Sequence, residues 1–90
     1  MADLIPWEAI EPGMTVWEEC SWGGGPIRME IIRRDDGGNL HIHCTLANGA
    51  TCEGVAYADK TFGQAAIKSP EFRYWDAEPT LNEMEGAPWE

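Results

Sequence analysis

Short stretches in which hydrophobic and polar residues alternate dominate the middle of the sequence, and this alternation is typical of β-strands with one buried face. Residues 27–36 alternate throughout except at Ile32. Residues 40–46 alternate as well, with His41 and His43 on the polar face of the predicted strand. From this pattern we predict five strands, at residues 14–20, 27–36, 40–46, 51–57 and 72–75.

Three turn sequences accompany these strands, one before the first strand and two between strands. Pro12 and Gly13 suit the central positions of a type II turn, because proline fixes φ at the first and glycine accepts the positive φ of the second. Residues 35–39 (DDGGN) and 47–50 (ANGA) are typical of hairpin turns. The strands between residues 27 and 57 are therefore predicted to form a meander.

Three other segments lack the strand pattern. Residues 1–11 contain Pro6 and predict a loose turn or short helix that covers the edge of a core. Residues 62–68 predict a short helical turn that ends before Pro70. Residues 81–90 are predicted to form an acidic mobile tail.

Ninety residues suffice for one small domain, which we place at residues 1–80. Tight turns between short strands predict a mainly β fold, either a small SH3-like five-stranded barrel or a strongly bent antiparallel sheet. In both, the strand at 72–75 closes on the strand at 14–20. An α+β fold is the alternative if residues 60–69 form a true helix on one face of the sheet.

Charge is unevenly distributed along the chain. Residues 1–20 contain five acidic residues and residues 76–90 contain five more, and neither segment contains lysine or arginine. The middle of the chain has six acidic and six basic residues, so the two ends carry the whole net charge of −10. A field of this sign opposes binding to nucleic acid or an anionic membrane and favours a protein partner with a basic surface. The alternative explanation is an acidic surface that serves only solubility.

The sequence favours a cytoplasmic protein. No stretch approaches the ~20 consecutive apolar residues of a membrane-spanning helix, and the first residues do not resemble a signal peptide. Three cysteines, Cys20, Cys44 and Cys52, cannot all pair within one chain. We therefore expect reduced thiols, buried as small apolar side chains, rather than a disulfide scaffold.

Candidate chemistry is sparse. His41 and His43 share one strand face about 6.5–7 Å apart, within reach of one metal ion, but Cys44 points to the opposite face. The sequence has no CxxC or HxxxH spacing and no GxSxG motif. Two carboxylate pairs, Glu18–Glu19 and Asp35–Asp36, are interpreted as solvated, because neighbours on a strand face opposite ways and the second pair lies in a turn. We predict neither an enzyme nor a cofactor, and His41 and His43 are the remaining metal candidates.

The aromatic residues outnumber the places in a core of this size. Alternation puts Phe72 and Tyr74 on one strand face and Arg73 and Trp75 on the other, so we expect one of these pairs at the surface. A tryptophan beside an arginine is typical of a binding hot spot. The alternative is that Trp75 packs under the chain ends and Arg73 pairs with a carboxylate. Trp22, in a glycine-rich loop, is a further exposed candidate.

Two segments resemble a known group of proteins. The sequence EPGMTVW at residues 11–17 resembles the opening segment of many small barrel proteins from bacteriophages and prophages. The sequence FRYWDAEPT at residues 72–80 is similar to their closing segment, an aromatic-Arg-x-Trp run followed by Pro-Thr. The resemblance implies a phage origin and a barrel more than an activity. In size, acidity and lack of catalytic residues, the chain also resembles small acidic phage inhibitors of host defence, of the anti-CRISPR type.

These observations lead to a functional hypothesis. The chain is expected to be a non-enzymatic binding protein that inhibits a host defence or nucleic-acid-handling protein, with its carboxylates on a basic surface meant for phosphates. The predicted contacts are Glu18, Glu19, Trp22, Asp35, Asp36, Arg73, Trp75 and Asp76, together with the acidic tail. The alternative is a structural or assembly module of a phage or host complex, in which exposed aromatic residues pair subunits. We expect a monomer or homodimer that contacts neither nucleic acid nor membrane directly.

Overall fold

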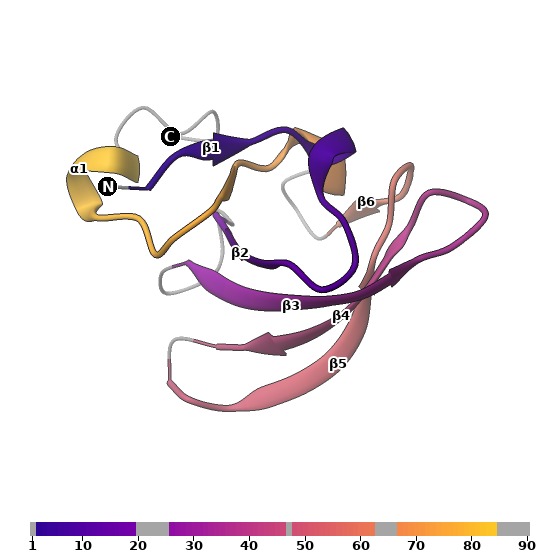
Figure 1. The fold of residues 1–90 in the computed structure, drawn as a ribbon, viewed down its shortest axis with the longest axis horizontal. Helices are drawn as coiled ribbons and strands as arrows, with labels where there is room; N and C mark the ends of the chain where they lie inside the picture. Colours follow the sequence, from indigo (N-terminus) through magenta and orange to yellow (C-terminus); the bar gives the residue numbers. More distant parts are fainter. Residues whose placement is uncertain (1, 20–25, 47, 63–66, 85–90) are drawn as a thin grey trace.

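One antiparallel sheet forms most of the structure, which is a computed structural model that describes residues 2–19, 26–46, 48–62 and 67–84. Within these residues the sheet has six strands, in the order β1-β8-β2-β3-β4-β5 (Figure 1). The strands are β1 (Leu4–Ile5), β2 (Thr15–Glu18), β3 (Ile27–Arg34), β4 (Leu40–Thr45), β5 (Thr51–Ala56) and β8 (Tyr74–Trp75). Every pair of neighbouring strands in the sheet is antiparallel.

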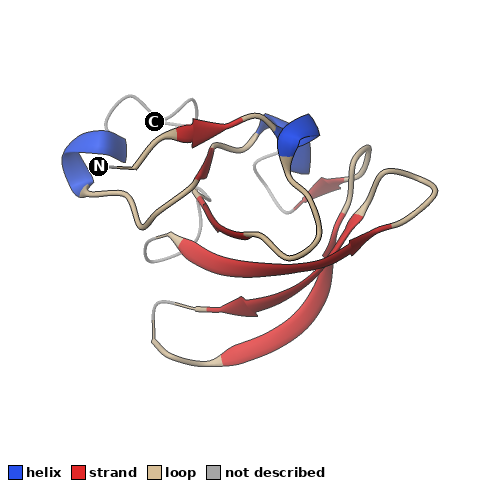
Figure 2. Cartoon of the chain, in the orientation of Figure 1, coloured by secondary structure: helices blue, strands red, loops and turns tan. Residues whose placement is uncertain are grey.

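The architecture is mainly β, as predicted, and strands account for most of the regular structure (Figure 2). β3, β4 and β5 form the predicted meander, and β8 pairs with β2, which places the 72–75 segment beside the 14–20 segment. The sheet has two edges, β1 and β5, so it does not close into a barrel. The bent antiparallel sheet is therefore the predicted architecture that the structure confirms.

The irregular position in the alternation of residues 27–36 has a structural cause. A bulge interrupts the pairing of β3 with β4 between Ile31 and Arg33. It falls on Ile32, whose side chain is 53% exposed, whereas Ile31 is only 4% exposed. The extra residue of a bulge has no partner on the neighbouring strand. The strand can therefore carry two successive outward-facing residues and then resume its alternation.

The prediction of a helical turn at residues 62–68 is wrong at both ends of that range. Instead, β6 (Thr61–Phe62) pairs with β7 (Ile67–Lys68) in a separate two-stranded sheet. Residues 63–66 lie outside the described residues. A 3-10 turn, η3 (Ser69–Glu71), follows β7. Among the described residues no helix from this region packs on the large sheet, so the α+β alternative is not realised there.

Both ends of the chain are more regular than predicted. Within the segment expected to be a loose turn or short helix, β1 adds a strand, and only η1 (Trp7–Ala9) forms a 3-10 turn. The first residues of the expected mobile tail form a short helix, α1 (Leu81–Met84). Residues 85–90 of that tail lie outside the described residues.

The predicted turns are present. The amide of Met14 donates to the carbonyl of Glu11 at 3.2 Å, and Gly13 between them has a φ of +90°. That backbone conformation strains residues with a Cβ atom, which is why glycine occupies the third turn position. The hairpin between β4 and β5 is closed by a 2.8 Å hydrogen bond from the amide of Leu46 to the carbonyl of Ala50.

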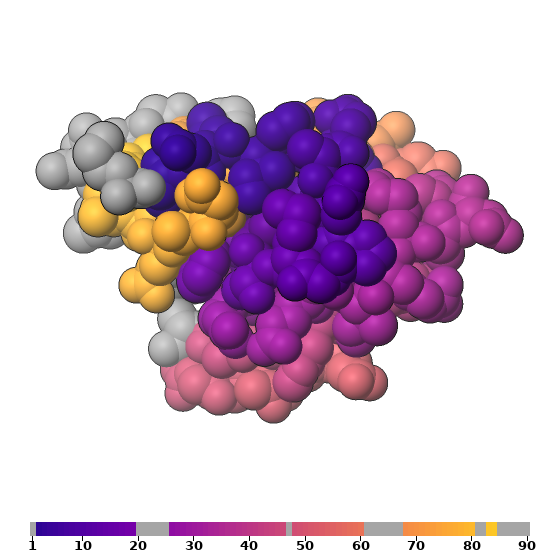
Figure 3. All heavy atoms as spheres, viewed as in Figure 1, coloured from indigo at the N-terminus to yellow at the C-terminus, as the bar shows by residue number. Residues whose placement is uncertain are grey.

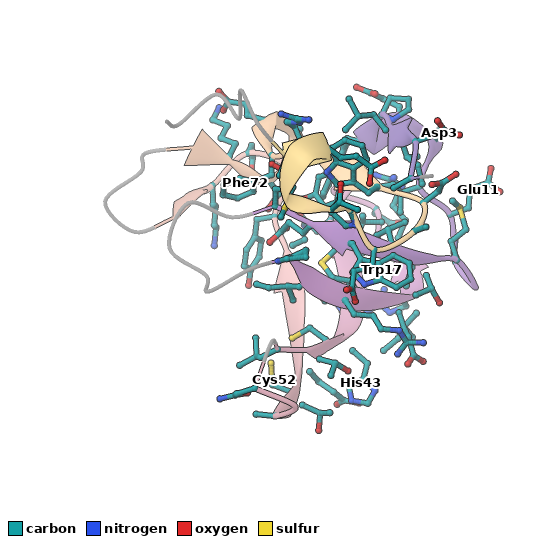
Figure 4. The ribbon with its side chains drawn as sticks, turned by 90° about the vertical axis from the view of Figure 1, so that its left-hand side faces the viewer. Asp3, Glu11, Trp17, His43, Cys52 and Phe72 are labelled. Atoms are coloured by element: carbon teal, nitrogen blue, oxygen red, sulfur yellow. The ribbon has the colours of Figure 1, made fainter. Side chains whose placement is uncertain are left out.

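The hydrophobic core draws side chains from η1, all the long strands, and the segment around β8. Leu40 and Val16 are completely buried, and Phe72 points into the interior (Figure 4). The rings of Trp7 and Tyr74 lie 5.7 Å apart between centroids in a tilted arrangement, which is a favourable geometry for an aromatic pair. The core cluster comprises Trp7, Ile10, Val16, Met29, Ile31, Leu40, Ile42, Cys44, Ala56, Phe72 and Tyr74.

Arg34 fixes η1 against the end of β3. Its guanidinium donates to the carbonyl oxygens of Trp7 at 2.9 Å and Ile10 at 2.8 Å, and to that of Gly38 at 3.0 Å. The same group lies 5.4 Å from the centre of the Trp7 ring, a cation–π distance. One partly buried arginine therefore joins the N-terminal segment to the β3–β4 hairpin.

Replacing two neighbouring isoleucines separately tests the assignment of faces. Ile31→Ala removes a buried side chain and is expected to cost about 2–5 kcal/mol of unfolding free energy, since it leaves a cavity. Ile32→Ala removes the same atoms from an exposed site and is expected to cost less than about 1 kcal/mol. Urea unfolding of both variants measures the difference, and equal losses would contradict the bulge at Ile32.

Candidate protein-binding surface

The two faces of the β2–β8 pair carry different side chains. Trp17 lies directly opposite Trp75, and Glu18 lies directly opposite Tyr74. Because successive residues on a strand face opposite ways, Glu18 and Tyr74 share the core face, and Trp17 and Trp75 share the other. This register brings two aromatic residues with polar hydrogens next to two consecutive carboxylates.

On the core face, Glu18 meets the hydroxyl of Tyr74. The Tyr74 oxygen lies 2.9 Å from a Glu18 carboxylate oxygen and 2.9 Å from the carbonyl oxygen of Ser69. Burial raises the pKa of Glu18 from 4.5 to about 7, while the hydrogen bond from Tyr74 acts in the opposite direction. A hydroxyl has one proton, so two full hydrogen bonds form here when Glu18 is protonated and itself donates to Tyr74.

On the other face, Glu19 binds Trp75 and Arg73. The indole Nε1–H of Trp75 donates to a Glu19 carboxylate oxygen, and Nε of Arg73 lies 3.6 Å from the same oxygen. The Arg73 guanidinium also lies 5.0 Å from the centre of the Trp75 ring and donates to the carbonyl oxygen of Glu83 in α1 at 3.0 Å. The buried charge of Glu19 is therefore paired and hydrogen-bonded, as interior carboxylates require.

This arrangement corrects the predicted role of the region. Glu19 is 3% exposed and Trp75 is 5% exposed, so neither lies at the surface, and Glu18 is partly buried rather than solvated. The expectation that one aromatic pair of residues 72–75 is exposed is wrong, because α1 and the N-terminal segment cover β8. The alternative, in which Trp75 packs under the chain ends and Arg73 pairs with a carboxylate, describes the structure.

The two acidic ends of the chain lie side by side. Asp3 and Asp76 are joined twice, by the amide of Asp76 donating to the Asp3 carbonyl at 2.9 Å and by the amide of Asp3 donating to a carboxylate oxygen of Asp76 at 2.7 Å. The amide of Ala2 donates to the carboxylate of Glu83 at 3.0 Å. Hydrogen bonds to its carboxylate, mainly from the backbone of Thr80, lower the pKa of Glu83. Two segments that are distant in sequence thus form one region.

Both of the segments that meet at this junction carry exposed carboxylates. The first segment of the chain and the segment after β8 lie next to each other on the face shown in Figure 3. Asp3 and Glu11 point outward on the same side of the molecule (Figure 4). We call the exposed carboxylates of the two ends the acidic face, and it consists of Asp3, Glu8, Glu11, Asp76 and Glu78.

Asp35 and Asp36 lie in the β3–β4 turn, next to the N-terminal segment to which Arg34 is hydrogen-bonded. Asp35 accepts hydrogen bonds from the amides of Gly37 at 2.9 Å and Asn39 at 3.0 Å, and its other oxygen lies 3.0 Å from Nε2 of His41. The contact with His41, together with these amides, lowers the pKa of Asp35 to about 2. Asp35 therefore stabilises the turn, and Asp36 is the exposed member of the pair.

The two histidines lie on the outer face of the sheet, as predicted, and both are partly buried. His41 is engaged with Asp35, and His43 lies in register with Glu30 on β3 and Glu53 on β5. Among the described residues, no group of three or more histidine, cysteine or acidic side chains is arranged to hold a metal ion. The outer face of β3, β4 and β5 therefore carries histidine and acidic side chains next to one another.

The remaining candidates divide between described and undescribed residues. Trp22 and Cys20 lie outside the described residues. Cys44 is buried, as expected, but Cys52, which lies on the edge strand β5, is exposed (Figure 4). The prediction that the cysteines are buried is therefore wrong for Cys52.

Comparison of the sequence with protein-family models and with curated proteins, and of the structure with solved structures, finds no match. In the part of the chain that the structure describes, no helix has both the length and the apolar character needed to cross a membrane.

Sequence reasoning missed the hydrogen bonds that hold Glu18 and Glu19. The available signal was that two consecutive acidic residues sit in one predicted strand and a Tyr-Trp pair in the strand expected to close on it. Assigning partners needs the register, however, and a slip of one residue exchanges the two faces. The junction of the acidic ends was missed for the same reason, because it depends on β1.

Glu18→Gln tests the titration of the Glu18 carboxyl. The folded protein keeps the Glu18 proton up to about pH 7, whereas the unfolded chain releases it near 4.5. This carboxyl's contribution to stability is therefore complete below the lower value and is lost as the pH rises to the upper one, on the order of 1–3 kcal/mol. Urea unfolding across this pH range should show that decline in the wild type and its absence in the variant.

Glu78→Gln is the matched control, since it makes the same change at an exposed position. Its unfolding free energy should follow the wild-type pH dependence. If Glu18→Gln also follows it, the carboxyl does not titrate in this range in the folded protein and the assignment fails.

Proposed function

We propose that this chain is a non-enzymatic binding protein whose acidic face engages a basic surface on a protein partner. The observation that supports this most directly concerns the two acidic segments, residues 1–20 and 76–90, neither of which contains lysine or arginine. These segments meet where β1 pairs with β8. Five carboxylates of these two segments are exposed in the part of the chain that the structure describes, whereas residues 21–75 have a balanced charge. Concentrated charge steers association with an oppositely charged surface.

The partner that fits best is a nucleic-acid-handling or host defence protein in the cytoplasm, which the chain would inhibit. Such proteins present basic grooves to phosphates, and carboxylates of the acidic face would occupy the groove and exclude the substrate. The resemblance of residues 11–17 and 72–80 to phage barrel proteins supports a phage origin for this role. The burial of Glu18, Glu19 and Trp75 moves the proposed contacts from that cluster to the acidic face.

A charge-matched comparison tests the proposal. The triple variant Asp3→Asn, Glu11→Gln, Glu78→Gln neutralises three carboxylates of the acidic face. In a tagged pull-down from bacterial lysate with a salt gradient, we expect it to release the wild-type partner at distinctly lower salt, because interactions between exposed charges are screened. Mass spectrometry identifies the partner, which should be a basic protein.

The matched control removes three exposed carboxylates elsewhere, Glu30→Gln, Glu53→Gln and Asp59→Asn. This variant has the same net charge as the first and should elute close to the wild type. If both variants elute alike, only the net charge matters and the acidic face is not the contact. If the wild-type partner resists high salt, electrostatic inhibition is wrong.

An assembly module is the second candidate, and the open edge at β5 favours it. β5 pairs with β4 alone among the described strands, and residues 51–54 are exposed. An exposed strand edge presents unpaired backbone groups that a second strand can complete. The 46–50 hydrogen bond fixes the alternation of the hairpin, so the amide of Glu53 faces away from β4.

Glu53→Pro therefore blocks the edge without removing a β4–β5 hydrogen bond. If β5 mediates self-association, light scattering should detect concentration-dependent oligomers of the wild type that the variant lacks. Glu53→Gln is the control and should assemble like the wild type. A wild-type protein that stays monomeric at all concentrations rules this candidate out.

A further inference from the structure

Two cysteines face each other across the β4–β5 hairpin. Cys44 and Cys52 are directly opposite in the register, so their side chains share one face of the sheet. Their sulfur atoms lie 2.7 Å apart, and the Cys44 sulfur is also 3.4 Å from the carbonyl oxygen of Cys52. Both are free thiols in the structure.

The backbone at this pair suits a covalent link. The Leu46 amide bonds to the Ala50 carbonyl, and hydrogen-bonded pairs recur at every second position of an antiparallel ladder, so 44–52 is such a pair. The Cα atoms of these pairs are about 5.5 Å apart, which is within the usual disulfide range of about 4.4–6.8 Å. The bond can therefore form without moving the strands.

The two thiols differ in their access to solvent. Cys52 is exposed, whereas Cys44 is 8% exposed. Burial raises the pKa of Cys44 to about 11, and its contact with Cys52 acts in the same direction. A reagent in solution therefore meets Cys52 first, and Cys44 is placed to react next with whatever is attached to the Cys52 sulfur.

We propose that Cys44 and Cys52 form a reversible dithiol–disulfide site that reacts with low-molecular-weight disulfides such as oxidised glutathione. The Cys52 thiolate attacks the small disulfide, forms a mixed disulfide and releases one small thiol, which takes up the Cys52 proton. The Cys44 sulfur then attacks the Cys52 sulfur and releases the second small thiol, which takes up the Cys44 proton. The protein loses two protons and two electrons, and one small disulfide becomes two thiols.

The bond would change the edge of the sheet. β5 is an edge strand held by β4, and a cross-link at 44–52 fixes its register near the hairpin tip. Cross-linking also restricts the unfolded chain. The oxidised protein is therefore expected to melt several degrees higher than the reduced protein, and a reductant should reverse the shift.

Tryptic mapping provides a direct test on the full chain. The reduced protein is incubated with oxidised glutathione at mildly alkaline pH, alkylated and digested. Trypsin cuts after Arg34 and Lys60, so both cysteines fall in peptide 35–60, whereas Cys20 falls in peptide 1–28. The expected product is peptide 35–60 without alkyl groups and lighter by two hydrogen atoms.

Three results would overturn the proposal. They are a peptide 35–60 that remains alkylated at both cysteines, one that accumulates a glutathione on Cys52 without closing, and one cross-linked to peptide 1–28. Cys52→Ser is expected to remain folded by circular dichroism and to lose the reversible rise in melting temperature. Cys20→Ser is the matched control and should keep both the cross-link and the rise.

Discussion

The insertion of β8 between β1 and β2 is the interaction on which the rest of the structure depends. Tyr74 reaches into the core from one face of β8, and Trp75 packs on the other. Each brings a polar hydrogen into a covered region, and the register places a carboxyl group beside it, that of Glu18 for Tyr74 and that of Glu19 for Trp75. Unpaired buried polar groups cost folding free energy. The register of β8 with β2 and the side-chain hydrogen bonds of Tyr74 and Trp75 therefore stabilise each other.

The same strand determines where charge appears on the surface. By holding β1 on its far side, β8 places the first and last described segments together, and their exposed carboxylates become neighbours. The carboxylates of Glu18 and Glu19 are withdrawn from this surface into the β2–β8 pair. The surface charge of the molecule therefore reflects the sheet order as much as it does the composition.

Local pattern predicted those parts of the fold that local physics decides. Alternation and turn chemistry identified β2 to β5 and their hairpins, because the side chains of a meander pack on close sequence neighbours. β1 could not be predicted from its two residues, since its only partner among the described strands is β8. The candidate binding residues were predicted less accurately for the same reason. Whether Trp75 is exposed depends on α1 and the N-terminal segment, not on the sequence around it.

The sheet order also bears on how the chain acquires its structure during synthesis. β1 leaves the ribosome before the other described strands, yet its partner β8 lies about 70 residues later in the chain. At roughly 5–20 residues per second, the N-terminal segment waits seconds for that partner, while the β3-β4-β5 meander can pair as soon as its hairpins emerge. The earliest of the described strands is thus the last to pair, and until then Trp7 lacks its aromatic partner Tyr74.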